Sequence, residues 1–139
     1  MIASWIVKRM IVSSFNIMSQ DHIDIGAVLK SYADDCVYGA TSEAGEGTVK
    51  GKKALTDWFQ NWEKENPKRK FEIRNIAFAA WPLMPTNVVM IDWTLTRVNR
   101  EGEVFRHSGY SVCYMKRYKM VRGHDYMVSC GPSSTLNPD

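Results

Sequence analysis

The sequence predicts one α+β domain in which three N-terminal helices pack on a mainly antiparallel sheet. Before Pro67, three segments carry apolar residues at three- and four-residue steps, and after Pro67 the apolar residues recur at two-residue steps. A chain of 139 residues also has the length of a single hydrophobic core. Because the helices come first and the strands follow as a group, we expect the helices to cover one face of the sheet.

Three helical patterns precede Pro67. In residues 1–19 the apolar side chains share one helical face. Asp21 or Asp24 is expected to cap a second helix that ends near residue 34, since a carboxylate accepts the free amide protons of a first turn. The third helix is expected at residues 52–65.

The remaining chain is predicted as strands and turns. A β-prone piece at residues 36–38 precedes a polar, glycine-rich stretch that is expected to be a loop over one end of the fold. Four strands are predicted at residues 70–80, 87–98, 103–115 and 119–129. The single domain is expected to span residues 1–130, and the polar residues 131–139 are expected to form a loose tail.

Charge and motifs exclude several function classes. The 18 basic and 15 acidic residues are spread along the chain, so we expect no nucleic-acid partner. No phosphate-loop, dinucleotide or HExxH motif is present, so we expect no cofactor and no metal. The three cysteines lack ligand spacing and are expected to be reduced thiols of a cytoplasmic protein. No apolar run is long enough to predict a membrane span.

Four segments, in this order, resemble the nuclear transport factor 2-like superfamily, especially its SnoaL-like, polyketide cyclase-like branch. They are residues 29–38 (LKSYADDCVY), 47–55 (GTVKGKKAL), 58–59 (WF) and 119–126 (KMVRGHDY). The resemblance covers nearly the whole chain and implies a cystatin-like cone, in which a curved sheet backed by helices encloses a small molecule. It does not fix the function, because this fold hosts many activities.

The enzyme classes of the superfamily are matched poorly at their catalytic positions. The general base that the resemblance to steroid isomerases implies falls on Ala40 or Thr41, neither of which can carry the proton. The partner acid falls near Tyr110, which retains a hydrogen-bond donor for an oxyanion. We therefore expect at most half of that catalytic arrangement.

Limonene-type epoxide hydrolases and SnoaL-type cyclases are matched no better. The resemblance implies an acidic residue where Val128 stands, and the arginine and second aspartate of the hydrolases fall on Trp93 and Leu95. Asp125 is three residues from Val128, and alternation along a strand would turn it to the other face.

Alternation also assigns the strand faces. Val89, Ile91, Trp93 and Leu95 are expected on the helix side, with Asp92 outward. The last strand carries one face made of Met120, Arg122, His124, Tyr126 and Val128, which the resemblance puts on the concave side. If Tyr110 also faces the pocket, then His107 does not.

The catalytic candidates are His124, Tyr110 and Tyr126. An imidazole titrates near working pH and phenols donate to a ligand oxygen, although a structural histidine and ordinary aromatic packing are the alternatives. The ligand-binding candidates are Tyr38, Trp58, Trp62, Trp93, Leu95 and Val128. The tryptophans are equally compatible with a simple core.

The function expected is binding of a small apolar, carbonyl-type ligand with cofactor-free isomerase, dehydratase or cyclase chemistry. The alternative is a non-catalytic ligand-binding or dimerisation module. We expect a homodimer through the outer sheet face, because Met90 and Val98 lie among its polar residues.

Overall fold

The computed structural model describes residues 2–42 and 45–132, which form three helices and a six-stranded sheet. The helices are α1 (Ile2–Met18), α2 (Ile25–Leu29) and α3 (Lys52–Glu65). The strands are β1 (Tyr32–Ser42), β2 (Gly45–Lys50), β3 (Lys68–Phe78), β4 (Thr86–Val98), β5 (Val104–Lys116) and β6 (Lys119–Pro132). The strand order is β2-β1-β6-β5-β4-β3, and only the β1–β6 pair is parallel. The predicted α+β class is confirmed.

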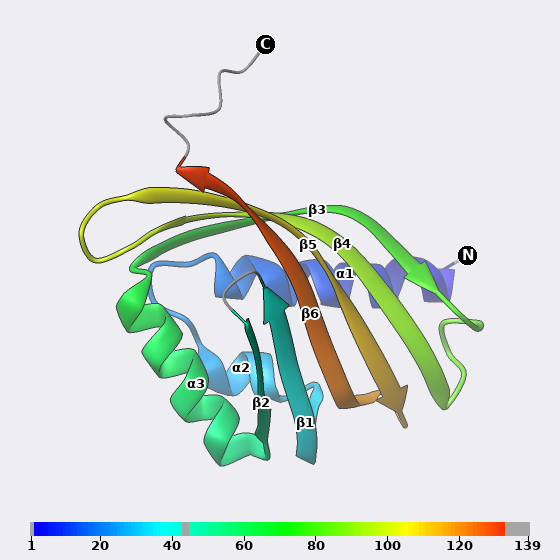
Figure 1. The fold of residues 1–139 in the computed structure, drawn as a ribbon. Coiled ribbons are helices and arrows are strands. Elements are labelled where there is room, and N and C mark those ends of the chain that lie inside the picture. The colour runs from blue at the N-terminus through cyan, green and yellow to red at the C-terminus, as the bar shows by residue number, and fades with distance from the viewer. Residues whose placement is uncertain (1, 43–44, 133–139) are drawn as a thin grey trace.

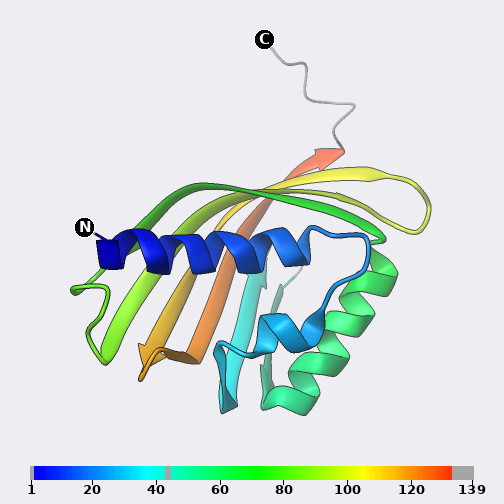
Figure 2. The same ribbon diagram turned by 180° about the vertical axis from the view of Figure 1, so that it is seen from behind.

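The sheet bends over the helices, so that its concave face is the covered one. Figure 1 shows β3 to β6 arching across α1, with α3 standing beside β1 and β2. The view from behind shows α1 running along the underside of the arch (Figure 2). Phe15 of α1 meets Phe71 of β3 edge to face, with ring centroids 5.1 Å apart. The expected cone of a curved sheet and three helices is therefore present.

The segment between α2 and α3 differs from the expectation. Asp24 caps α2 by accepting a hydrogen bond from the Ala27 amide at 3.0 Å, as predicted, but α2 ends at Leu29. Tyr32, expected in the helix, already belongs to β1 and is buried. The expected glycine-rich loop is the β1–β2 hairpin. Gly39 serves packing there, because a Cβ atom would lie 2.7 Å from Nδ1 of His124.

The β5–β6 hairpin contains a bulge that decides which side chains face the helices. Arg117 and Tyr118 form its two-residue turn with φ values of 50° and 63°, as in a type I′ turn. Tyr114 pairs with Arg122 and Met115 pairs with Met120, so residue 121 has no partner across the ladder. This extra residue reverses the alternation of β6 after Met120.

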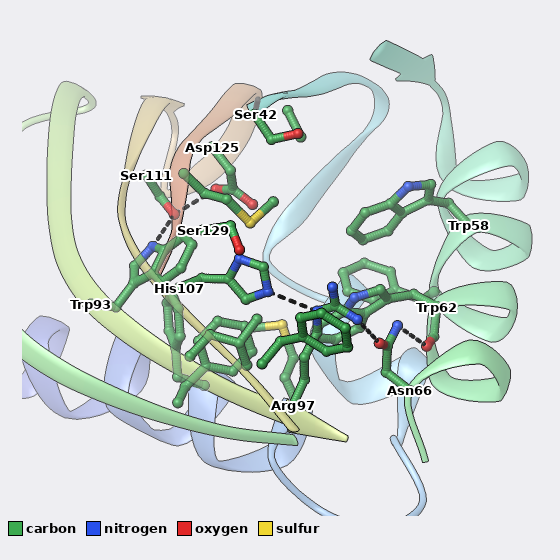
Figure 3. Close-up of a pocket in the computed structure, with 18 of the residues that line it drawn as sticks. Ser42, Trp58, Trp62, Asn66, Trp93, Arg97, His107, Ser111, Asp125 and Ser129 are labelled. Carbon is green, nitrogen blue, oxygen red and sulfur yellow. Dashed lines mark hydrogen bonds between the residues drawn. The ribbon is translucent and has the colours of Figure 1, made fainter. Parts of the chain in front are cut away.

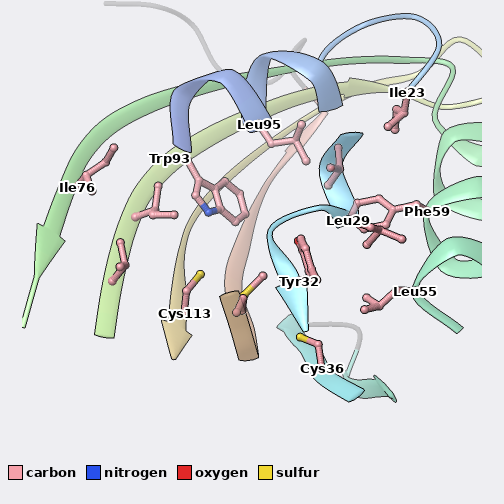
Figure 4. Close-up of a cluster of buried hydrophobic side chains, with 14 residues drawn as sticks. Ile23, Leu29, Tyr32, Cys36, Leu55, Phe59, Ile76, Trp93, Leu95 and Cys113 are labelled. Atoms are coloured by element: carbon pink, nitrogen blue, oxygen red, sulfur yellow. The ribbon is translucent and has the colours of Figure 1, made fainter. Parts of the chain in front are cut away.

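One core joins the helices to the concave face. Its buried apolar residues include Ile23, Val28, Leu29, Leu55 and Phe59 from the helical layer, and Val89, Ile91, Trp93 and Leu95 from β4 (Figure 4). The predicted inward face of β4 is thus confirmed. Arg69 ties the helix ends to β3, since its guanidinium donates to the carbonyls of Met18, Gln20 and Asn66.

The C-terminal boundary differs slightly from the prediction. β6 continues through Pro132, so the first two residues of the expected tail belong to the sheet. The rest of that tail, residues 133–139, lies outside the described residues. Among the described residues, no helix combines the length and hydropathy needed to cross a membrane.

Candidate functional site

A cavity of about 650 Å³ lies between the concave face of the sheet and helices α1 and α3. This volume is in the range of pockets for small organic molecules. Aromatic side chains form most of its apolar wall: Phe15, Trp58, Phe59, Trp62, Phe71, Trp93 and Phe105. Trp58 and Trp62, on successive turns of α3, stack with an interplanar angle of 8° and offer flat apolar surface (Figure 3).

The expected ligand-binding residues divide between the two faces of the sheet. Tyr38, Trp58, Trp62, Trp93 and Leu95 all lie on the wall of the cavity. Val128 does not line this cavity; it lies on the convex face of the sheet and is 57% exposed.

The expected catalytic residues lie together, but on the convex face. Tyr110 and Tyr126 are cross-strand partners that stack with ring centroids 5.0 Å apart, and they are 43% and 39% exposed. His124 packs on Tyr126, and its Nε2 is 2.7 Å from Oγ1 of Thr41. Their expected concave placement is wrong, because the bulge at Val121 shifts the alternation by one residue.

The same shift brings Asp125 into the cavity, opposite to the expectation. Tyr38 donates a hydrogen bond to Oδ2 of Asp125, and Ser111 donates to Oδ1 at 2.5 Å. Ser111 in turn accepts from the indole N–H of Trp93 at 2.9 Å. Because the indole nitrogen only donates, the Ser111 hydroxyl is oriented towards Asp125.

Burial sets the electrostatics of this group. It raises the pKa of Asp125 above the ordinary value, against the opposing effects of the Ser111 and Tyr38 hydrogen bonds and of nearby His124. Burial, followed by the charge of Asp125, also raises the pKa of Tyr38 well above the ordinary value. Tyr38 therefore stays a protonated donor, while Asp125 is more easily protonated than an exposed carboxylate.

A second polar group lines the cavity at Arg97, Asn66 and His107. The Arg97 guanidinium donates from Nε to Nε2 of His107 at 2.8 Å and from Nη1 to Oδ1 of Asn66 at 2.7 Å. The guanidinium carbon of Arg97 lies 4.5 Å from the centroid of the Phe105 ring. In Figure 3, the His107 ring lies between Arg97 and Asp125.

His107 is only 7% exposed and faces the cavity; it lies on the opposite face from Tyr110, as the alternation required, but Tyr110 is the outward one. Burial and then the charge of Arg97 lower its pKa to about 4, so the imidazole is neutral near pH 7. Burial likewise lowers the pKa of Arg97 below its ordinary value.

Sequence patterns contained part of this site. The inward series on β4, continued by two residues beyond Leu95, reaches Arg97. His107 is the cross-strand partner of Leu95, so it shares the inward face. The inward position of Asp125 could not be predicted in this way, because the residue types around Val121 do not indicate a bulge. Within residues 2–42 and 45–132, no three His, Cys, Asp or Glu side chains are grouped as metal ligands would be.

No known protein-family model matches the sequence, and no curated protein matches it. Solved structures do match. A proposed aromatic ring hydroxylase from Novosphingobium aromaticivorans is 17% identical, with a TM-score of 0.74 over 91% of this chain and 87% of that one. A nuclear transport factor 2-like protein of unknown function from Burkholderia pseudomallei is 13% identical, with a TM-score of 0.69 over 86% and 88% of the two chains.

A third solved structure is a protein with a ketosteroid isomerase-like fold from Catenulispora acidiphila, in complex with trimethylamine. It is 13% identical, with a TM-score of 0.69 over 84% of this chain and 83% of that one. At these identities the similarity concerns the fold, and the SnoaL-like branch stays a prediction. The helix-backed cone and these structures together show that the chain has the nuclear transport factor 2-like fold.

Proposed function

We propose that the protein binds a small, largely apolar molecule in the cone and transfers a proton on it without a cofactor. Asp125 is the acid–base group of this proposal. The observation that carries it is a carboxyl group on the wall of an aromatic cavity, with a pKa raised by burial. Such a carboxyl group accepts and returns a proton more readily than one that is always ionised.

The hydrogen bonds around Asp125 support a proton-transfer cycle. The ionised carboxyl group accepts from Tyr38 and Ser111. When Asp125 takes a proton from a carbon next to a ligand carbonyl, the electron pair of the C–H bond moves towards the carbonyl oxygen. Once protonated, the Asp125 carboxyl group carries an O–H donor and no longer needs both hydrogen bonds that it accepted. The Tyr38 hydroxyl can then donate to the ligand carbonyl oxygen.

Return of the proton from Asp125 then decides the reaction class. Delivery to a second carbon of the enolate completes an isomerisation, and delivery to a departing hydroxyl group completes a dehydration. The stacked tryptophans of α3 would hold a cyclic ligand and exclude water from the transfer. The names of two similar structures, an aromatic ring hydroxylase and a ketosteroid isomerase-like fold, also favour a cyclic ligand.

Hydrogen–deuterium exchange tests this proposal without knowledge of the natural substrate. Cyclic ketones with acidic α-hydrogens, among them β,γ-unsaturated ones, are incubated with the protein in D₂O, and deuterium uptake and double-bond migration are measured by mass spectrometry and absorbance. We expect uptake above buffer with the wild type and a loss of about 100-fold or more in Asp125→Asn. Asp92→Asn, on the convex face, is the matched control and should retain the wild-type rate.

A non-catalytic binding module is the second candidate, and one observation favours it. Both oxygens of Asp125 already accept hydrogen bonds, as in a buried carboxyl group that only stabilises a fold. Under this reading, no ketone in the panel takes up deuterium, while native mass spectrometry finds the same bound small molecule on the wild type and on Asp125→Asn. Uptake that is equal in wild type and Asp125→Asn would also overturn the catalytic role.

We also propose a cytoplasmic location. It is supported by Cys36 and Cys113, which are buried free thiols. Thiol quantification on protein isolated under alkylating conditions would test for this reduced state.

A further inference from the structure

The cavity carries a cation whose donors are only partly used. Of the five N–H donors of the Arg97 guanidinium, one bonds to His107 and one to Asn66. Both acceptors are neutral, and none of the ion pairs within the described residues includes Arg97. The charge is partly withdrawn from water, and Phe105 covers the guanidinium at 4.5 Å. An arrangement of this kind favours an anion that is not part of the described chain.

His107 supplies a donor beside this cation. Its Nε2 accepts the hydrogen bond from Nε of Arg97, so the hydrogen of the neutral imidazole is on Nδ1. Nδ1 is fully buried and has no hydrogen-bond partner within the described part of the chain. A buried donor without a partner is destabilising, and an acceptor on a bound molecule would remove that cost. The imidazole ring lines the cavity, and because Nδ1 itself is closed off, a ligand atom reaches it only when a side chain of the cavity wall shifts.

The one carboxylate that lines the cavity among the described residues belongs to the other polar group. Asp125 accepts from Tyr38 and Ser111 and, within the described residues, makes no hydrogen bond or ion pair with Arg97. Arg69, the cross-strand partner of Arg97, adds a second guanidinium, which is engaged with backbone carbonyls. Because Glu63 and Asp21 act on Arg69 and no carboxylate of the described residues is paired with Arg97, the charge left uncompensated at this end of the cavity is that of Arg97.

We infer that Arg97 and His107 receive the carboxylate of the ligand, and that the ligand class is an aromatic or cyclic carboxylic acid. A carboxylate is planar and matches the two parallel N–H donors that Nη1 and Nη2 of an arginine present. One of its oxygens would also accept from Nδ1 of His107. The apolar ring system then lies along Trp58 and Trp62. This inference rests on the proposed function, since it names the substrate class for the same cavity.

Matched acid and amide probes test the inference by isothermal titration calorimetry at pH 7.5. The probes are benzoate and 2-naphthoate, each paired with its neutral amide. We expect the wild type to bind at least one acid about 10-fold or more tightly than its amide, as charge-assisted hydrogen bonds predict. In Arg97→Met this preference should disappear, while the affinity for the amide stays within about twofold. Arg74→Met, which removes a guanidinium from the convex face, should keep the preference.

Two further measurements keep the test decisive if Arg97→Met folds poorly. Arg97→Lys retains the charge without the planar pair of donors, so an intermediate preference is expected. In the ¹⁵N-labelled wild type, 2-naphthoate should bring the Nδ1 proton of His107 into slow exchange with water, and 2-naphthamide should not. Equal affinities for acid and amide, a preference that survives Arg97→Met, or binding of neither probe series would each overturn the inference.

The inference and the proposed reaction fail separately. Acid preference that depends on Arg97, together with deuterium uptake that ignores Asp125, would leave the carboxylate site and remove the catalysis. Asp125-dependent uptake by neutral ketones without any acid preference would do the reverse.

Discussion

Acid should destabilise this protein through His107, and the structure gives the size of the effect. Burial and Arg97 lower the pKa of this imidazole from 6.5 to about 4 in the folded state. Between these two pH values the unfolded chain binds a proton that the folded chain rejects. The free energy of unfolding therefore falls as the pH falls. The full loss of unfolding free energy, reached below both values, is about 3 kcal/mol, and most of it occurs between pH 7.5 and pH 4.5.

Urea unfolding of the wild type and of His107→Gln at these two pH values isolates this term. The glutamine oxygen keeps an acceptor for the Nε–H of Arg97 but does not titrate. We expect His107→Gln to be less stable than the wild type at pH 7.5, and its loss of stability on acidification to be smaller by about 2–3 kcal/mol.

Asp125 acts in the opposite direction but does not disturb the comparison. Its pKa is raised in the folded state, so its contribution to the free energy of unfolding grows as the pH falls. That contribution is present in both proteins and cancels in the difference. If wild type and His107→Gln lose the same free energy between pH 7.5 and 4.5, the assignment of a buried neutral His107 is refuted.

Two other substitutions probe the fold and the convex face. Arg69→Met removes the donor from four backbone carbonyls and should lower the free energy of unfolding by about 3 kcal/mol or more, measured in urea. Arg106→Met, at an exposed position, is the control. If Arg69→Met lowers the free energy of unfolding by less than about 1 kcal/mol, the buried role of Arg69 is contradicted. If the convex face forms the expected homodimer, Val128→Asp should halve the mass measured by light scattering, whereas Leu83→Asp on an exposed turn should not. A monomeric wild type would refute the dimer.

The architecture was predictable because its signals are periodic and strong. The change of period at Pro67 separates the helices from the four long strands. Asn66 is the C-cap of α3, which ends where the third helix was expected to end. Alternation from Val89 to Leu95 gave the inward face of β4, since that stretch of the strand is regular. Such patterns hold wherever many residues repeat the same environment.

Local geometry escaped prediction where one residue decides it. The glycine-rich composition of residues 39–51 is typical of a loop. In the structure, however, Gly39 lies in the sheet, where His124 and Thr48 leave no room for a side chain. The bulge at Val121 had a larger effect. Because of this single unpaired residue, Asp125 lies on the concave face and His124 lies on the convex face. A catalytic residue inferred by counting along a strand depends on every intervening pair of the ladder.

The two polar groups of the cavity differ in a way that separates binding from chemistry. Trp93, Ser111, Tyr38 and Asp125 satisfy one another, so a ligand gains little affinity by adding a hydrogen bond there. Arg97 and His107 retain unused donors, so a ligand that accepts from them gains affinity. A molecule held by its carboxylate at Arg97 would leave its other end to Asp125, whose raised pKa is useful only if a proton moves. Loss of Arg97 should then weaken binding of the ligand, and loss of Asp125 should slow turnover at unchanged affinity.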